Sequence, residues 1–315
     1  MVNNSNANSK FTRNLAHTEV EVREKAFKNL TKWLQSREDI PALDMLRIWK
    51  GLFYAFWHSD LQPVQADLAD RLANIILLLD NVEVCEEYFG GFLSTMRREW
   101  FGIDKLRLDK YMMLVRTFLT YLFRYLGEKN EWEVARVEKF MSMLLERGLL
   151  GAEDLAAGIG FNLHLADVFA AAFKDVEGHL AGQSAIIRAT AMEPFIQVLA
   201  RHPNETVLKR VQTEVFEGTF SQLLQELPKE AEEERACIAA AQEIVAARAR
   251  QLAEDPDLVK SQKNRRYLYE VCTMLSKKKK KAGGKRTREE ETEAETGGSG
   301  RATQEEAEAE PSDKK

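Results

Sequence analysis

The side chains that could do catalytic or metal chemistry are scattered along the sequence. The histidines are His17, His58, His164, His179 and His202, and the cysteines are Cys85, Cys237 and Cys272. No HExxH, GxSxG, Walker or GxGxxG arrangement occurs among them or their neighbours. No CxxC pair exists either, so neither a zinc site nor a disulfide framework is indicated. We therefore expect no catalytic residue, no metal site and no cofactor.

The closest approach to a catalytic pair is His164 with Asp167, which lie three positions apart and would share one face of a helix. A metal site needs three or four ligands, so we expect a hydrogen-bonded structural pair instead. Adjacent carboxylates such as Glu86 and Glu87 are mostly solvated helix faces in a chain with 50 acidic residues. A hydrolase or metal nuclease would need its acids drawn into an apolar cleft, which the sequence does not indicate.

A segment from Met96 to Tyr111 interleaves cations with aromatic residues. Its cations are Arg97, Arg98, Lys105, Arg107 and Lys110, around Trp100, Phe101 and Tyr111. Cations beside aromatic rings suit phosphate contact and base stacking, so these cations form a candidate surface for RNA or a partner protein. The simpler interpretation places the aromatics in the core and pairs the cations with Glu99, Asp104 and Asp109. Composition alone favours that interpretation.

Within this segment the apolar pattern separates an inner from an outer face. Leu108 begins an apolar stripe that continues through Met112 and Val115 at helical spacing. We therefore expect Leu108 to point inward, together with Trp100 and Leu106. Four of the cations, Arg98, Lys105, Arg107 and Lys110, are expected wholly or partly at the surface.

The C-terminal tail carries the densest charge. Its basic cluster consists of Lys277, Lys278, Lys279, Lys280, Lys281, Lys285, Arg286 and Arg288. Acidic stretches follow at 289–295 and 305–310, with almost nothing apolar to bury, so disorder is expected from residue 276 on. A dense basic cluster in a flexible tail suits a nuclear import receptor or RNA phosphates. A merely solubilising tail is the alternative, and nuclear targeting is favoured.

Long amphipathic helices must position all of these residues, because Leu, Ala, Glu, Lys and Arg dominate and strand-like runs are scarce. Apolar residues recur at helical spacing over 19–35, 45–56, 68–79, 84–100, 108–122, 131–147, 152–174, 185–200, 205–227, 230–253 and 259–275. Short turns between such helices predict antiparallel packing, as a closed bundle or a stack of hairpins. We predict an all-α fold, a divergent armadillo/HEAT-like α-solenoid over residues 10–275, with disordered segments at 1–9 and 276–315.

Charge and hydropathy limit the partners and the compartment. The formal net charge is −5, and the residues from Lys277 on carry 11 Lys/Arg and 10 Asp/Glu, so the body is acidic. An acidic body argues against coating nucleic acid, and RNA contact should be local. No run approaches the ~20 apolar residues of a membrane span, and the polar N-terminus lacks a signal-peptide core. We expect an intracellular protein without a membrane partner.

Several short segments between Phe11 and Phe220 match, in order and at sensible spacing, those of one known protein family. They are Trp49–Tyr54 with Trp57, Asp60 and Gln65–Ala69; Glu99–Trp100 with Gly102–Tyr111 and Leu114–Arg116; Gly158–Ile159, His164–Asp167 and Pro194–Phe195; and Leu208–Val211 with Val215–Phe216. Together these segments resemble the nucleolar ribosomal RNA processing protein 1 family of eukaryotes. The chain departs from the family pattern by lacking a proline before Gly158 and by carrying alanines after Phe169.

The resemblance implies a non-catalytic scaffold of the nucleus and nucleolus that acts in precursor rRNA processing on pre-60S particles. It implies pre-60S assembly factors and ribosomal proteins as partners, with precursor rRNA contacted directly or indirectly, and an import receptor would bind the basic tail. A HEAT-like nuclear transport or chromatin adaptor would share this fold and tail, and is the alternative. An unrecognised nuclease is a further alternative, which a cleft with clustered acids would indicate.

Overall fold

The computed structural model describes residues 14–15, 17, 19–151, 155, 158–177, 185–228 and 230–276. The chain divides into two units, 1–276 and 277–315, and the described residues all belong to the first. The predictions of disorder at 1–9 and from Lys277 on fall outside the described residues. The elements in chain order are α2 (Val20–Gln35), α3 (Ala42–Trp57), α4 (Gln62–Leu78), α5 (Val82–Glu99), η1 (Trp100–Gly102), α6 (Lys105–Arg124), η2 (Tyr125–Lys129), α7 (Val134–Met143), η3 (Leu144–Leu149), α8 (Ile159–Glu177), α9 (Ala185–Arg201), α10 (Glu205–Arg210), η4 (Val211–Gln222), α11 (Leu223–Glu226), α12 (Glu232–Glu254) and α13 (Gln262–Ser276).

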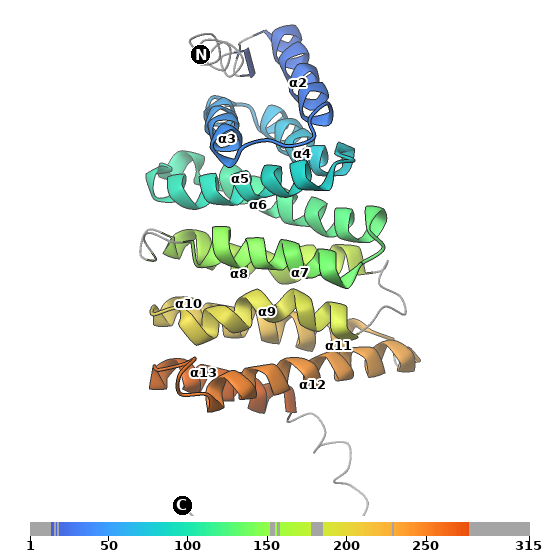
Figure 1. The fold of residues 1–315 in the computed structure, drawn as a ribbon, viewed down its shortest axis with the longest axis vertical. Coiled ribbons are helices and arrows are strands. Elements are labelled where there is room, and N and C mark those ends of the chain that lie inside the picture. The colour runs from blue at the N-terminus through green and yellow to red at the C-terminus, as the bar shows by residue number, and fades with distance from the viewer. Residues whose placement is uncertain are drawn as a thin grey trace, which may run out of the picture. The chain divides into compact units, whose positions relative to one another are not determined.

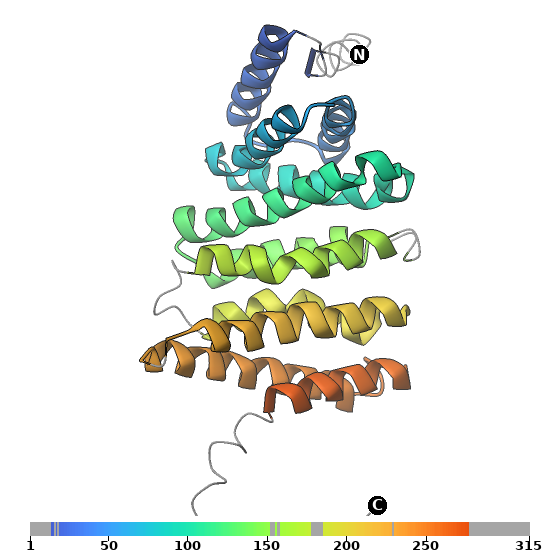
Figure 2. The same ribbon diagram turned by 180° about the vertical axis from the view of Figure 1, so that it is seen from behind.

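These helices follow one another through the described unit in chain order (Figure 1). Most long helices pack against the second helix along the chain: α3 on α5, α4 on α6, α6 on α8, and α7 on α9. From behind, the same order is seen from the blue α2 to the orange-red α13 (Figure 2). The prediction of an all-α fold of stacked antiparallel helices is confirmed for the described residues. The second-neighbour contacts are compatible with an armadillo/HEAT-like solenoid.

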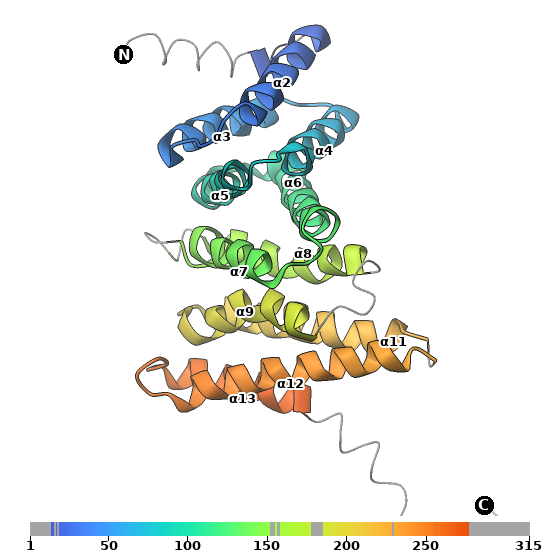
Figure 3. The ribbon, with the colours of Figure 1, turned by 45° about the vertical axis from the view of Figure 1, so that its right-hand side comes forward.

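Two rows of helices result from this second-neighbour packing. Turned by 45°, the unit shows α3 and α5 on one side and α4 and α6 on the other (Figure 3). Further along, α8 packs on η4, and α12 packs on both α9 and α13. The long α12 therefore closes the described stack against two neighbours at once.

Aromatic side chains fill the core between α3, α5 and α6. The indole N–H of Trp49 donates to the carbonyl of Tyr88 at 2.8 Å, and the Tyr88 hydroxyl donates to the carbonyl of Leu72 at 3.0 Å. The rings of Phe92 and Phe118 stack at 3.9 Å between centroids, beside Trp49. Each polar atom on these rings meets a carbonyl of a neighbouring helix, so burial leaves it satisfied.

Local sequence signals set several helix boundaries. The side chains of Asn81 and Asn204 accept hydrogen bonds from the N–H groups of Val84 and Val207 at the first turns of α5 and α10. The helix predicted over 152–174 begins later, at Ile159, and Gly158 lies in the turn before it. A side chain larger than glycine at position 158 would clash with the guanidinium of Arg97, as described below.

Candidate partner-binding surface

The corner where α5 turns into α6 contains most of the basic and aromatic segment. The α5 helix ends at Glu99, the short η1 follows, and α6 begins at Lys105. The carboxylate of Asp104 caps α6 by accepting from the N–H groups of Leu106 at 3.0 Å and Arg107 at 3.2 Å. The Arg107 guanidinium donates to the same carboxylate at 2.6 Å, and this bond is the main cause that lowers the pKa of Asp104. The corner is thus tied together by its own side chains.

Trp100 anchors this corner to α8. Its buried ring lies 5.2 Å from the ring of Phe161 and stacks on His164 at 5.5 Å. A Cβ added to Gly160 would approach the indole nitrogen to 2.9 Å, so a glycine is needed where α8 passes the ring. The prediction that Trp100 points inward is confirmed.

Arg97 is buried, with 8% of its surface exposed, and it binds the C-terminal end of η3. Its guanidinium donates to the carbonyls of Gly148 at 2.8 Å and Leu149 at 3.2 Å and to the side-chain oxygen of Asn162 at 3.1 Å. A Cβ on Gly158 would stand 2.1 Å from one guanidinium nitrogen. Arg97 is therefore removed from the candidate surface, because its charge satisfies helix-end carbonyls inside the protein.

Lys110 is also buried, with 7% of its surface exposed, so its predicted place at the surface is wrong. Its ammonium donates to the carbonyls of Trp57 and Ser59, both at 2.7 Å, at the C-terminal end of α3. Burial lowers the pKa of Lys110. The favourable end of the α3 dipole and two carbonyl acceptors compensate part of the loss of water around the charge.

Two large apolar side chains stand in solvent at this corner. Phe101 is 88% exposed and Leu106 is 93% exposed, the largest fractions among the exposed large hydrophobic residues of the described chain. The inward orientation predicted for Leu106 is wrong. Leu106 lies nine positions before the fully buried Val115, which is two and a half turns at about 3.6 residues per turn, so the two face opposite ways. Leu108 is partly buried against the core, as predicted.

The remaining cations are close neighbours of these two apolar side chains in the sequence. Arg98 is exposed and pairs with Glu99 at 2.8 Å, and Lys105 is exposed without an ion-pair partner in the described part of the chain. Arg107 is partly buried, with its guanidinium 4.8 Å above the ring of Trp57. We call Arg98, Phe101, Lys105 and Leu106 the corner surface. Sequence patterns alone did not distinguish the exposed Phe101 from the buried aromatic residues. Its position next to Gly102, between two helices, was the one signal of exposure in a turn.

The other segments that the sequence singled out lie beside this corner. The hydroxyl of Tyr111 donates to the carbonyl of Phe53 at 2.8 Å, and the two rings stack at 4.7 Å. The ring N–H of His164 donates to the carbonyl of Met112 at 2.9 Å, and burial lowers the pKa of His164. Asp167 pairs with Arg210 at 2.7 Å, and the Nδ1 atom of His164 has no hydrogen-bond partner among the described residues, so the predicted hydrogen bond between His164 and Asp167 is not formed.

The paired carboxylates are engaged in ion pairs. Glu86 pairs with Arg136 at 3.3 Å and with Lys139 at 3.7 Å, and Glu87 pairs with Arg147 at 2.9 Å. Among the described residues, no group of three or more His, Cys, Asp or Glu side chains is placed to hold a metal ion. In the same part of the chain, each helix is too short or too polar to cross a bilayer. The basic cluster from Lys277 to Arg288 lies outside the described residues.

Comparison with known proteins places this arrangement in a family. A family model described as "Nucleolar protein, Nop52" matches residues 6–315. The Mus musculus protein named ribosomal RNA processing protein 1 homolog B is 33% identical over 232 residues, which cover 71% of this chain and 31% of the mouse protein. Its Homo sapiens counterpart is 31% identical over 223 residues, covering 69% of this chain and 28% of the human protein.

A third relative, the Drosophila melanogaster ribosomal RNA processing protein 1 homolog, is 31% identical over 217 residues, covering 66% of this chain and 30% of its own length. The chain spans less than a third of the length of these three relatives. The resemblance to the nucleolar ribosomal RNA processing protein 1 family, predicted from the sequence segments, is confirmed. The chain belongs to the Nop52 family of nucleolar proteins.

Proposed function

We propose that this protein is a non-catalytic nucleolar scaffold needed for precursor rRNA processing during assembly of the large (60S) ribosomal subunit. Its helical stack holds assembly factors and folded precursor rRNA in an arrangement that other enzymes process. The names of the relatives, which refer to ribosomal RNA processing, and the nucleolar family support this role.

The observation that carries the proposal is the corner surface. Phe101 and Leu106 are held in solvent by a turn that Trp100 anchors and Asp104 caps. Large apolar side chains that face water in the free protein are typical of a surface that a partner covers, because burying them against the partner is favourable. We assign the corner surface to docking on large-subunit precursors, with Arg98 and Lys105 as its cations in place of the original set of five.

The partners of this role are pre-60S assembly factors, ribosomal proteins and precursor rRNA, which the chain contacts directly or through those proteins. The basic cluster from Lys277 to Arg288 recruits a nuclear import receptor. An acidic body argues against contact along an RNA strand and fits contact at one place on a particle.

Depletion of the protein, followed by rescue, tests this function. Loss of the protein should cause large-subunit rRNA precursors to accumulate, and the full chain should restore their processing. A rescue chain without residues 277–315 should accumulate less in the nucleus, because the basic cluster is gone. Normal processing after depletion would contradict the proposal and would favour a nuclear transport or chromatin adaptor.

Catalysis is tested separately with the purified chain. Incubation with precursor rRNA and Mg²⁺ should leave the RNA intact, because the paired acids are occupied by cations. Specific cleavage that depends on Mg²⁺ would show that the protein is a nuclease and not a scaffold.

A further inference from the structure

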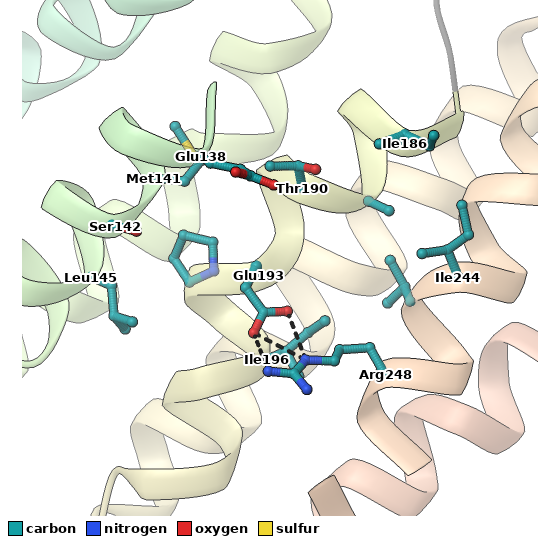
Figure 4. A pocket seen from close by; sticks show the side chains of 13 residues that line it. Glu138, Met141, Ser142, Leu145, Ile186, Thr190, Glu193, Ile196, Ile244 and Arg248 are labelled. Carbon is teal, nitrogen blue, oxygen red and sulfur yellow. Dashed lines mark hydrogen bonds and ion pairs between the residues drawn. The ribbon is translucent and has the colours of Figure 1, made fainter. Parts of the chain in front are cut away.

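A groove lies along one side of α9, between α7 and α12, on other helices than the corner surface (Figure 4). Its volume is about 420 Å³. The side chains that line it are Glu138, Met141, Ser142, Leu145, Ile186, Ala189, Thr190, Glu193, Pro194, Ile196, Ile244, Val245 and Arg248. Helices α7, α9 and α12, of which α9 packs on both of the others, contribute with η3 to one concave surface.

The groove is mainly apolar and open to solvent. Ile186 is 53% exposed and Ile244 is 41% exposed, on α9 and α12, while Leu145 and Ile196 continue the lining. Exposed branched aliphatic side chains beside a hollow are typical of surfaces that receive the apolar side chains of a partner.

The central charges of the groove neutralise each other. The guanidinium of Arg248 donates to both oxygens of Glu193 at 3.1 to 3.3 Å, as the dashed lines in Figure 4 show. The side-chain amide of Gln197 also donates to Glu193, at 2.8 Å, and Arg248 donates to Gln251 at 2.9 Å. This ion pair needs no ligand to complete it.

Two further hydrogen-bond acceptors of the groove lie outside this ion pair. Pro194 lies within α9 and carries no N–H, so the carbonyl of Thr190 loses the donor that would stand four residues on. Glu138 at the rim is exposed and has no ion-pair partner in the described part of the chain. A ligand that brings donors and positive charge would complement the exposed carboxylate of Glu138 and the Thr190 carbonyl, to which position 194 offers no N–H.

We propose that this groove binds a basic amphipathic helix of a partner protein. The apolar face of that helix, with side chains at i, i+3/i+4 and i+7, fills the groove, and its Lys or Arg side chains reach Glu138 and the Thr190 carbonyl. A helix suits the site because its backbone N–H and C=O groups bond to each other, so the apolar groove need not supply partners for them. The lining holds two acids against one base, which disfavours RNA in this place.

The sequence excludes the chain's own tail as the occupant. Residues 277–315 contain no Leu, Ile, Val, Phe or Met, so they cannot fill an apolar groove. A second copy of the chain is treated as an outcome of the test, because pairing through the groove would give a dimer.

Peptide display on the full-length chain tests the proposal. A random 16-residue library is selected on the wild type and counter-selected on the double variant I186E/I244E. The expected survivors carry apolar residues at helical spacing together with Lys or Arg. In fluorescence anisotropy their synthetic versions should bind the wild type at least 10-fold more tightly than I186E/I244E. Glu138→Gln should weaken them about threefold.

Leu258→Glu is the matched control, since Leu258 is also exposed but lies outside the lining, and it should leave peptide binding unchanged. The proposal is overturned if the survivors are acidic or lack helical spacing, or if counter-selection removes none of them. It is also overturned if the wild type is a dimer that I186E/I244E converts to a monomer. The experiment needs no pre-ribosome, so its failure leaves the proposed function untouched.

Discussion

The α3–α6 region and the α9–α13 region make the same kind of helix contact with different side chains. Between α3, α5 and α6 the buried residues are mostly aromatic, and Trp49, Tyr88 and Tyr111 each donate to a carbonyl of another helix. In α12 the buried face is instead rich in alanine, including Ala241, Ala246 and Ala249. Aromatic rings tied to named carbonyls permit one register, and a rigid corner is built on them. Alanines let helices approach closely but fix little beyond the contact itself.

The largest difference between the two regions should appear when a buried side chain is shortened. Trp49→Ala should lower the free energy of unfolding by about 3–5 kcal/mol, because a fully buried ring and its hydrogen bond are lost. Ala249→Gly in α12 should cost about 1–2 kcal/mol, from helix propensity and one methyl group. Urea unfolding of both variants measures these costs. An equal cost would show that the aromatic core between α3, α5 and α6 does not depend more on its individual side chains than α12 does.

The next effect concerns the buried guanidinium of Arg97. Gly158→Ala should cost about 2 kcal/mol or more, because the new methyl group displaces a charged donor from its carbonyl acceptors. Gly218→Ala is the matched control, since its Cβ would meet only ordinary contacts at 3.6 Å or more. In a double-mutant cycle with Arg97→Met, the cost of Gly158→Ala should shrink. An unchanged cost would mean that Arg97 does not set this turn.

Acidification should weaken the protein through two buried histidines, one near each region. Burial lowers the pKa of His164 and of His202, so the unfolded state takes up protons first. Stability is then fully present above the unfolded pKa of about 6.5 and falls as the pH drops through the lower folded values, by up to about 1.4 kcal/mol per pH unit for each histidine. Urea unfolding between pH 8 and 5 should show this slope, and it should flatten in His164→Gln and His202→Gln. If both variants show the same slope as the wild type, the acid sensitivity belongs to other groups.

The smallest effect on stability should come from the corner surface itself. Arg98→Glu and Lys105→Glu should change the free energy of unfolding by about 0.5 kcal/mol or less, because both side chains are exposed and an exposed ion pair contributes little. Thermal melts check this, with Lys110→Glu as the contrasting variant. Lys110→Glu should destabilise the protein strongly, because it replaces the donor to two buried carbonyls with a negatively charged acceptor. A large loss in Arg98→Glu would show that the corner surface is structural.

Helical periodicity predicted the helices well, but it did not predict which distant groups the long side chains contact. The predicted stripe packs against the core as expected, with Leu108 and Met112 partly buried and Val115 fully buried, because a stripe depends only on spacing. Lys110 reaches carbonyls 53 and 51 positions earlier in the chain, and Arg97 reaches acceptors more than 50 positions later. No local pattern encodes such partners. The exposure of Leu106 depends on the helix start that Asp104 caps. The groove beside α9 depends on the packing of helices that are distant in the sequence.

The central claim is that the corner surface docks the protein on large-subunit precursors. Its most direct test is sedimentation of the full chain with those precursors, comparing F101A/L106A with L43A/L61A, which removes two exposed leucines elsewhere. Both variants should melt like the wild type, since the lost side chains are exposed. We predict that F101A/L106A leaves the precursor fractions while L43A/L61A stays in them. A folded F101A/L106A protein that still sediments with the precursors would contradict the claim.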